Sequence, residues 1–204
     1  MRVKSTVISL LLLLLAACSE PSKQAAQQKE PAKPPEPVTG RYAFYQMYTA
    51  ARSWAADLQP LQLVSMPIRE VKVEGAKFGA WQAVFVSPSR QRTRIYTYSV
   101  AEAEGNIHKG VFGRADEAYT PRPQLKMFNI QAFKIDSDEA LKVAMTKGAE
   151  YAKKNPDKPI NFQLSFNDRY PNLVWRVYWG DSISSSNFSI VVDASTGDYK
   201  ETMR

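Results

Sequence analysis

The sequence predicts an α+β protein whose folded part has two related halves, each with a helix packed on an antiparallel sheet. One observation is a repeated pattern, in which WQAVFV (81–86) and WRVYWG (175–180) each lead through a polar turn into a second extended segment. The other is an amphipathic helical pattern upstream of each of these two segments. A helix laid across one face of a sheet buries the apolar side of both, which makes a stable two-layer domain.

The first half, residues 41–122, is predicted to begin with a helix over residues 42–58, which stops before Pro60 because proline cannot continue a helix. Its apolar side chains recur at helical spacing: Phe44, Tyr48, Ala51, Ala55 and Leu58. Extended segments follow this helix. Of these, residues 81–86 and 93–100 should pair as a hairpin around the polar turn between them.

The second half, residues 123–204, is predicted to contain a helix over residues 137–154. Asp136 and Glu139 have the spacing of a capping box at its start, and Asn155-Pro156 ends it. Acidic residues at this position are better explained by the helix dipole, which favours negative charge there, than by a cation site.

Strands are predicted on both sides of this helix. MFNIQAFKI (127–135) should add a strand before it, and NFQLSF (161–166) alternates apolar and polar residues as a half-buried strand does. Residues 175–180 and 187–194 then form the second hairpin. Residues 120–124, TPRPQ, are the expected junction, and the sequence leaves open whether the two halves share one sheet.

Residues 1–17 have the parts of a secretory signal peptide: a positive start, an apolar stretch and small residues before Cys18. The apolar stretch is shorter than the roughly 20 residues that a membrane-spanning helix needs. Leu15-Ala16-Ala17-Cys18 resembles a bacterial lipobox. The resemblance implies that diacylglycerol is attached to the sulfur of Cys18 and that the chain is cut just before it. The alternative is a spare thiol in a tail.

The lipobox resemblance also bears on location. In lipoproteins of bacteria with two membranes, an aspartate after the cysteine favours the inner membrane. Ser19 stands there instead, so we expect a cell-envelope protein, on the periplasmic side of the outer membrane if the cell has two membranes. Two or three acyl chains would hold it, since each buried methylene contributes about 0.8 kcal/mol.

Residues 18–40 are predicted to be a disordered tether between the lipid and the folded part. They hold five prolines and no aromatic residue, so they have almost nothing to bury. Such a tether spans between roughly 25 and 70 Å. Cys18 is the only cysteine of the chain, so the folded part cannot rely on disulfides.

The charge of the chain is mildly positive. Residues 41–122 hold 11 basic and 7 acidic side chains, and residues 123–204 hold 11 and 10. This excess suits attraction to an anionic lipid or polymer, and it is far below that of nucleic-acid-binding domains. We therefore expect no nucleic-acid partner.

The second half resembles the PepSY domain. The resemblance covers roughly residues 137–200 and rests on an EALKVA helix start, a tryptophan-bearing strand and a closing VDASTG. Asp193 and Thr196 can hydrogen-bond nearby backbone N–H groups, and Gly197 can take the positive φ that a bulged hairpin needs. PepSY domains occur in exported and envelope proteins, so the resemblance implies a module that binds or restrains a partner without catalysis.

Two features are candidates for binding. Arg90, Arg92 and Arg94 alternate in RQRTR, so on a strand their side chains would share one side and suit a phosphate or carboxylate. The alternative is a solvated hairpin rim that keeps a strand edge soluble. Tyr178 has the opposite parity to Trp175 and Trp179, so an aromatic side chain would be exposed on one face unless both faces are covered.

The sequence offers no recognisable catalytic or metal-binding set. The single His108 lies in GNIHKG, which is typical of an exposed turn, and one histidine with one cysteine does not make the usual ligand set of a zinc site. No phosphate-binding glycine loop is present. We therefore predict neither metal nor cofactor.

The combined hypothesis is a lipid-anchored envelope protein that is not an enzyme and binds a protein or peptide partner. Two alternatives stay open. One is a structural accessory that binds peptidoglycan or anionic lipid through its arginine-rich half. The other is a hydrolase that uses carboxylates alone, because carboxylates brought together by folding cannot be recognised in a sequence.

Overall fold

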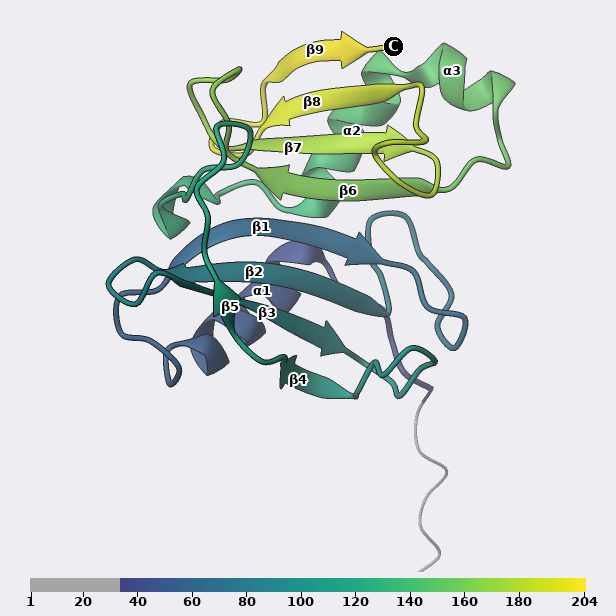
Figure 1. The fold of residues 1–204 in the computed structure, drawn as a ribbon. Coiled ribbons are helices and arrows are strands. Elements are labelled where there is room, and N and C mark those ends of the chain that lie inside the picture. The colour runs from purple at the N-terminus through teal and green to yellow at the C-terminus, as the bar shows by residue number, and fades with distance from the viewer. Residues whose placement is uncertain (1–33) are drawn as a thin grey trace, which may run out of the picture. The chain divides into compact units, whose positions relative to one another are not determined.

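The computed structural model describes residues 34–204, which form one compact unit. Their centre is a nine-stranded antiparallel sheet with the strand order β4-β3-β2-β1-β6-β7-β8-β9, and β5 also pairs with β3 (Figure 1). The strands are β1 (Gln59–Met66), β2 (Ala80–Ser87), β3 (Arg92–Ser99), β4 (Gly110–Gly113), β5 (Glu117–Ala118), β6 (Ile160–Ser165), β7 (Val174–Trp179), β8 (Ser189–Asp193) and β9 (Tyr199–Met203). Both expected halves therefore contribute to one sheet, with β1 paired to β6 between them.

The helices that pack on the sheet lie on one of its faces (Figure 1). They are α1 (Gly40–Ala51), which contacts β1 to β4, and α2 (Ser137–Lys147), which contacts β7 to β9. The short helix α3 (Ala149–Lys154) follows α2, and a 3-10 helix η1 (Ile130–Ala132) precedes it. Along the chain, α1 is followed by the meander β1–β2–β3, and α2 and α3 by the meander β6–β7–β8.

One apolar core runs beneath both helices and across the β1–β6 junction. Trp81 and Trp175, which occupy the same place in the repeated pattern, lie with their ring centroids 6.3 Å apart. The indole N–H of Trp81 donates to the carbonyl of Val38, and that of Trp175 to the carbonyl of Ile135, both at 2.9 Å. Each acceptor lies two residues before the first residue of a helix. The two tryptophans therefore fix the two helix starts in the same way.

The first turns of α1 and α2 are also bonded to each other. The Asp136 carboxylate accepts from the backbone N–H groups of Ser137 at 2.7 Å and Arg41 at 2.8 Å. The Ser137 hydroxyl accepts from the backbone N–H of Gly40 at 3.0 Å. Glu139 completes the predicted capping box by accepting from the backbone N–H of Asp136. We call Gly40, Arg41, Asp136 and Ser137 the helix-start clamp.

Replacing Gly40 by alanine should destabilise the fold, because the first residue of α1 lies against two buried rings. An added Cβ would lie 2.9 Å from Cη2 of Trp175 and 3.0 Å from Cη2 of Trp81. Both indoles are buried and hydrogen-bonded, so they cannot move aside without cost. We expect a loss of about 1–3 kcal/mol in the free energy of unfolding, measured by urea titration. Thr39→Ala, which removes no side-chain cap, is the matched control and should change little.

The helix ends differ from the prediction. α1 stops at Ala51 instead of residue 58, and turns follow it. Ala55 and Leu58 are nevertheless buried in the core, so their apolar spacing reflects burial within a turn. The helix predicted over 137–154 is divided at Gly148. A Cβ at this position would lie 3.1 Å from the Phe188 ring and 3.2 Å from the Trp179 ring, so the glycine permits close packing there.

The strand predicted over residues 127–135 is wrong. This segment contains η1, and the side chain of Asn129 accepts from the backbone N–H of Gln131 at 2.9 Å. A local side-chain bond of this kind competes with sheet pairing. Phe128 and Phe133 are buried, so the apolar spacing that suggested a strand comes from an irregular segment lying on the core.

The boundary predicted for the tether, at residue 40, is also wrong by a few residues. Val38 exchanges two backbone hydrogen bonds with Phe78, both at 2.9 Å, and Gly40 already belongs to α1. The predicted signal peptide, Cys18 and the tether up to residue 33 lie outside the described residues.

Candidate functional site

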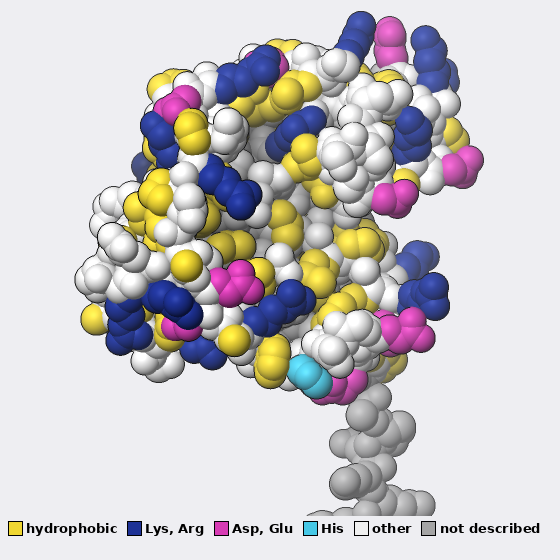
Figure 2. Space-filling view, in the orientation of Figure 1, with side chains coloured by type: hydrophobic (Ala, Val, Ile, Leu, Met, Phe, Trp, Pro, Cys, Tyr) yellow, Lys and Arg dark blue, Asp and Glu magenta, His cyan; other side chains and the backbone are white. Residues whose placement is uncertain are grey.

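The face of the sheet opposite the helices is the candidate site, and we call it the helix-free face. Successive side chains of a strand point to opposite faces, so Arg176 points away from the side of Trp175 and Val177. Figure 2 shows this face hollowed over the middle of the sheet, with hydrophobic and basic side chains around the hollow. Residues 114–125 cross it as a strap, held where β5 pairs with β3.

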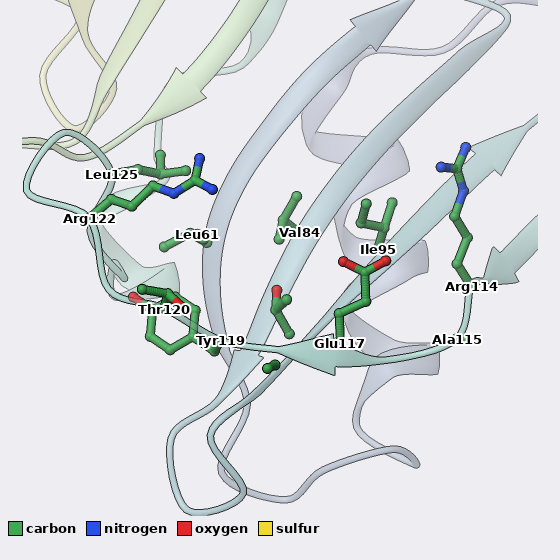
Figure 3. A pocket seen from close by; sticks show the side chains of 12 residues that line it. Leu61, Val84, Ile95, Arg114, Ala115, Glu117, Tyr119, Thr120, Arg122 and Leu125 are labelled. Atoms are coloured by element: carbon green, nitrogen blue, oxygen red, sulfur yellow. The ribbon is translucent and has the colours of Figure 1, made fainter.

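A cavity of about 340 Å³ lies between the first half of the sheet and the strap (Figure 3). It has an apolar lining contributed by Leu61, Val84, Ile95 and Leu125. Arg114 and Arg122 stand on opposite sides of it, with Glu117 between them (Figure 3). These three charged side chains are exposed and form no hydrogen bond or ion pair with any described residue. The cavity therefore combines an apolar lining with two arginine side chains that have no ion-pair partner among the described residues.

A second cavity, of about 180 Å³, lies over the other half of the same face. Gln124 of the strap lines it, and the next residue, Leu125, lines the first cavity, so the strap separates the two. Its apolar lining comes from Val174, Ile183, Val191 and Met203. Its principal polar groups are Arg169, Tyr170 and Arg176.

The polar groups of the second cavity differ in how far their hydrogen-bonding atoms have partners. Arg169 forms a two-pronged pair with Glu201, at 2.6 and 3.2 Å. Arg176 donates from Nε to the Ser189 hydroxyl at 3.0 Å, and its two terminal nitrogens have no partner among the described residues. Burial lowers the pKa of the Arg176 guanidinium from its ordinary value.

The Tyr170 hydroxyl is buried and forms no hydrogen bond of acceptable geometry with the described residues. Burial, assisted by the neighbouring Glu201 carboxylate, raises the pKa of Tyr170 to about 12. The hydroxyl therefore stays protonated at neutral pH and remains available as a donor. A buried polar group without a partner is uncommon and calls for an explanation.

The structure places Arg90, Arg92 and Arg94 at the β2–β3 turn and the start of β3, where all three bond to their own chain. Arg90 donates to the Trp54 carbonyl at 2.7 Å. Arg92 pairs with the Asp116 carboxylate at 2.8 Å and, with Trp54, lowers the pKa of that carboxyl. Arg94 donates to the Arg114 carbonyl at 2.6 Å and lies over the Tyr96 ring. Their side chains connect the turns after α1, the sheet and the strap, so the three arginines do not form an unoccupied site for an anion.

Tyr178 lies on the face opposite Trp175 and Trp179, as its parity predicts, but it is only 6% exposed. Burial raises its pKa from the ordinary value. Both faces at this strand are covered, so Tyr178 does not present an exposed aromatic surface for binding.

The predicted turn at Asp193, Thr196 and Gly197 is present. The Asp193 carboxylate accepts from the backbone N–H groups of Ser195 at 2.8 Å and Thr196 at 3.2 Å. Gly197 has a φ of +82°, and the pairing of β8 with β9 shifts register between Val191 and Val192, where Lys200 is the extra residue of β9. These residues therefore form the turn that joins β8 to β9.

His108 is exposed near a turn, where it contacts Glu102 at 3.2 Å. Within residues 34–204, no group of three or more histidine, cysteine, aspartate or glutamate side chains is placed to hold a metal ion. No helix in this part of the chain is long and apolar enough to cross a bilayer.

Sequence reasoning did not single out Arg114, Arg122 or Arg176. One signal was available for Arg176, which is the only charged residue in the apolar strand VWRVYW. The others lie in loops or in the strap, whose path over the sheet no local pattern indicates.

Comparison with known proteins gives little further information. No protein-family model matches the chain, and no curated protein matches it. The crystal structure of a candidate lipoprotein (CD1622) from Clostridium difficile 630 is similar with a TM-score of 0.42 and 10% sequence identity, over 78% of this chain and 91% of that one.

Proposed function

We propose that this protein is a lipid-anchored component of a bacterial cell envelope whose helix-free face binds an extended segment of a partner protein, without catalysis. The lipid anchor rests on the resemblance of residues 15–18, which end in Cys18, to a lipobox. The binding role rests on one observation, the hollowed face with two cavities on either side of the strap.

The sizes of the cavities favour a peptide over one compact ligand. Pockets for small molecules usually enclose roughly 300–1,000 Å³; the first cavity, at about 340 Å³, lies at the lower end of this range, and the second, at about 180 Å³, lies below it. An extended segment presents successive side chains at intervals along its length. It can therefore fill separate cavities that a single rigid molecule cannot.

The charges of the face favour an acidic segment. The two cavities are lined by four basic side chains and one acidic one: Arg114, Arg122, Arg169, Arg176 and Glu117. Only Arg169 among the four is neutralised by an ion pair within the described residues. The remaining cations would steer an acidic partner and fix its register.

The PepSY-like organisation into two related halves belongs to the same proposal. It is supported by the matching order of helix and meander and by the equivalent bonds of Trp81 and Trp175 to the helix starts. Two related halves side by side in one sheet would offer one extended partner about twice the helix-free face of a single half.

Photo-crosslinking in cells tests the binding surface. Benzoylphenylalanine placed at Glu117 or Arg122, on the strap, should crosslink one protein, and mass spectrometry should identify an acidic segment of it. The same group at Gln46 or Lys142, which are exposed on the helices, should give no such product. Crosslinks from the helices alone, or none, would contradict the proposal.

Two further arms of this experiment address the other hypotheses. Cys18→Ala should move the protein out of the membrane fraction, which tests the anchor separately. Recovery of only cell-wall fragments or lipid from Glu117 and Arg122 would favour the structural accessory. Nothing observed in residues 34–204 singles out the carboxylate hydrolase.

A further inference from the structure

We infer that the second cavity is a carboxylate-binding site, in which Arg176 and Tyr170 receive an acidic group from the partner segment. The inference rests on the proposed function, and it adds the chemistry by which one cavity recognises its occupant. It starts from two donors in the same cavity that the fold leaves unused.

The first donor is the guanidinium of Arg176. It extends from the centre of β7 onto the helix-free face, and only its Nε is bonded, to Ser189. The two terminal nitrogens form a planar fork whose spacing matches the two oxygens of a carboxylate. The nearest acid, Glu201, is already engaged through both oxygens by Arg169. The charge of Arg176 is therefore half-buried without a counter-ion bonded to it.

The second donor is the hydroxyl of Tyr170. It is protonated at neutral pH and buried, and it forms no hydrogen bond of acceptable geometry with the described residues. Its neighbour Glu201, which contributes to the raised pKa of Tyr170, is already held through both oxygens by Arg169. Leaving a buried hydroxyl unbonded costs roughly 1–3 kcal/mol, which an incoming acceptor would recover. A carboxylate that received two bonds from Arg176 would still have lone pairs for this hydroxyl.

The surroundings distinguish a carboxylate from a phosphate. After the Arg169–Glu201 pair is counted, the cavity offers one uncompensated positive charge, which matches a monoanion. A phosphate group with nearly two negative charges would face the Glu201 carboxylate with too little compensation. The cavity is small, at about 180 Å³, and its apolar lining suits the aliphatic part of an acidic side chain or of a C-terminal residue.

The test uses residues 34–204, which form a compact unit with its own core. The probe is N-acetyl-leucinate, and the matched neutral probe is N-acetyl-leucinamide. In a titration followed by nuclear magnetic resonance, the acid should shift signals of Arg176 and of the residues around Tyr170. The amide should not. Inorganic phosphate should bind more weakly than the acid.

Two variants give the site its strictest test. Tyr170→Phe removes only the unbonded hydroxyl, so the fold should keep its stability while the affinity for N-acetyl-leucinate falls about five-fold. Arg176→Gln should weaken binding by about ten-fold or more. Lys142→Gln, which removes an exposed cation of α2 away from this face, is the control and should leave this binding unchanged. Unchanged affinity in Tyr170→Phe and Arg176→Gln, equal binding of acid and amide, or equal binding of phosphate would overturn the inference.

The test of the carboxylate site and the crosslinking test of the proposed function can fail independently of each other. If crosslinks from the strap persist at full yield in Arg176→Gln cells, the partner-binding face stands and the carboxylate site is refuted. If N-acetyl-leucinate binds as expected but no crosslink forms from the strap, the carboxylate site stands and the protein partner is refuted.

Discussion

Replacing Asp136 by alanine is expected to lower the free energy of unfolding by about 2–4 kcal/mol, because one carboxylate holds the starts of both major helices. The substitution leaves the backbone N–H groups of Arg41 and Ser137 without their acceptor, and each unsatisfied buried donor costs roughly 1–3 kcal/mol. It also removes the N-cap of α2 and the charge near the Arg41 guanidinium, 3.9 Å away.

Equilibrium unfolding in urea measures this loss. Asp136→Asn keeps an oxygen acceptor and should cost roughly half as much, since asparagine is also a good N-cap. Asp157→Ala is the matched control, because this aspartate is exposed and unbonded, and it should change stability by less than about 0.5 kcal/mol. A loss below that value in Asp136→Ala would show that the helix-start clamp does not stabilise the fold.

Replacing Asp193 by asparagine is expected to lower the free energy of unfolding by about 2–4 kcal/mol at pH 7. The carboxylate is fully buried. In addition to two backbone N–H groups of the turn, it accepts from Asn172 Nδ2 at 2.7 Å and pairs with Lys200 at 3.1 Å. An amide cannot accept from all four donors, so the substitution leaves several of them unsatisfied.

This loss should depend on pH in a defined direction. Burial alone would raise the pKa of Asp193, but the bonds from Asn172, Ser195 and Lys200 outweigh it and the pKa is lowered. A carboxyl with a lowered pKa in the folded state stabilises the protein above its unfolded pKa, about 3.9, and loses that contribution as pH falls through the folded value.

Comparing the wild type with Asp193→Asn at several pH values isolates the contribution of the Asp193 carboxyl, because the other carboxyls titrate in both proteins. The difference in stability between the wild type and Asp193→Asn should be largest at neutral pH and shrink below about pH 4. Asp181→Asn, an exposed loop change, should show no such pH dependence. A difference that stays constant down to pH 2 would contradict the assignment.

Local chemistry was predictable from the sequence. The capping box at Asp136 and Glu139 and the positive φ at Gly197 require only residues close in the chain. The strands around 81–86, 93–100, 161–166, 175–180 and 187–194 follow from alternation with period two. The errors have one physical source. Ala55, Phe128 and Phe133 are apolar because they are buried, and burial occurs in turns and irregular segments as well as in helices and strands.

Tertiary structure alone decided how these pieces meet. The β1–β6 pairing that makes one sheet has only three residue pairs and no signature in either segment. The partners of Arg90, Arg92 and Arg94 come from the turns after α1 and from the strap, so side-chain spacing could not reveal that these arginines are already bonded. Likewise, Arg176 and Tyr170 become a pair of unused donors only where loop, strap and sheet close around one cavity. Sequence patterns record local periodicity and turn chemistry, whereas a site assembled across a sheet depends on long-range packing that no local pattern encodes.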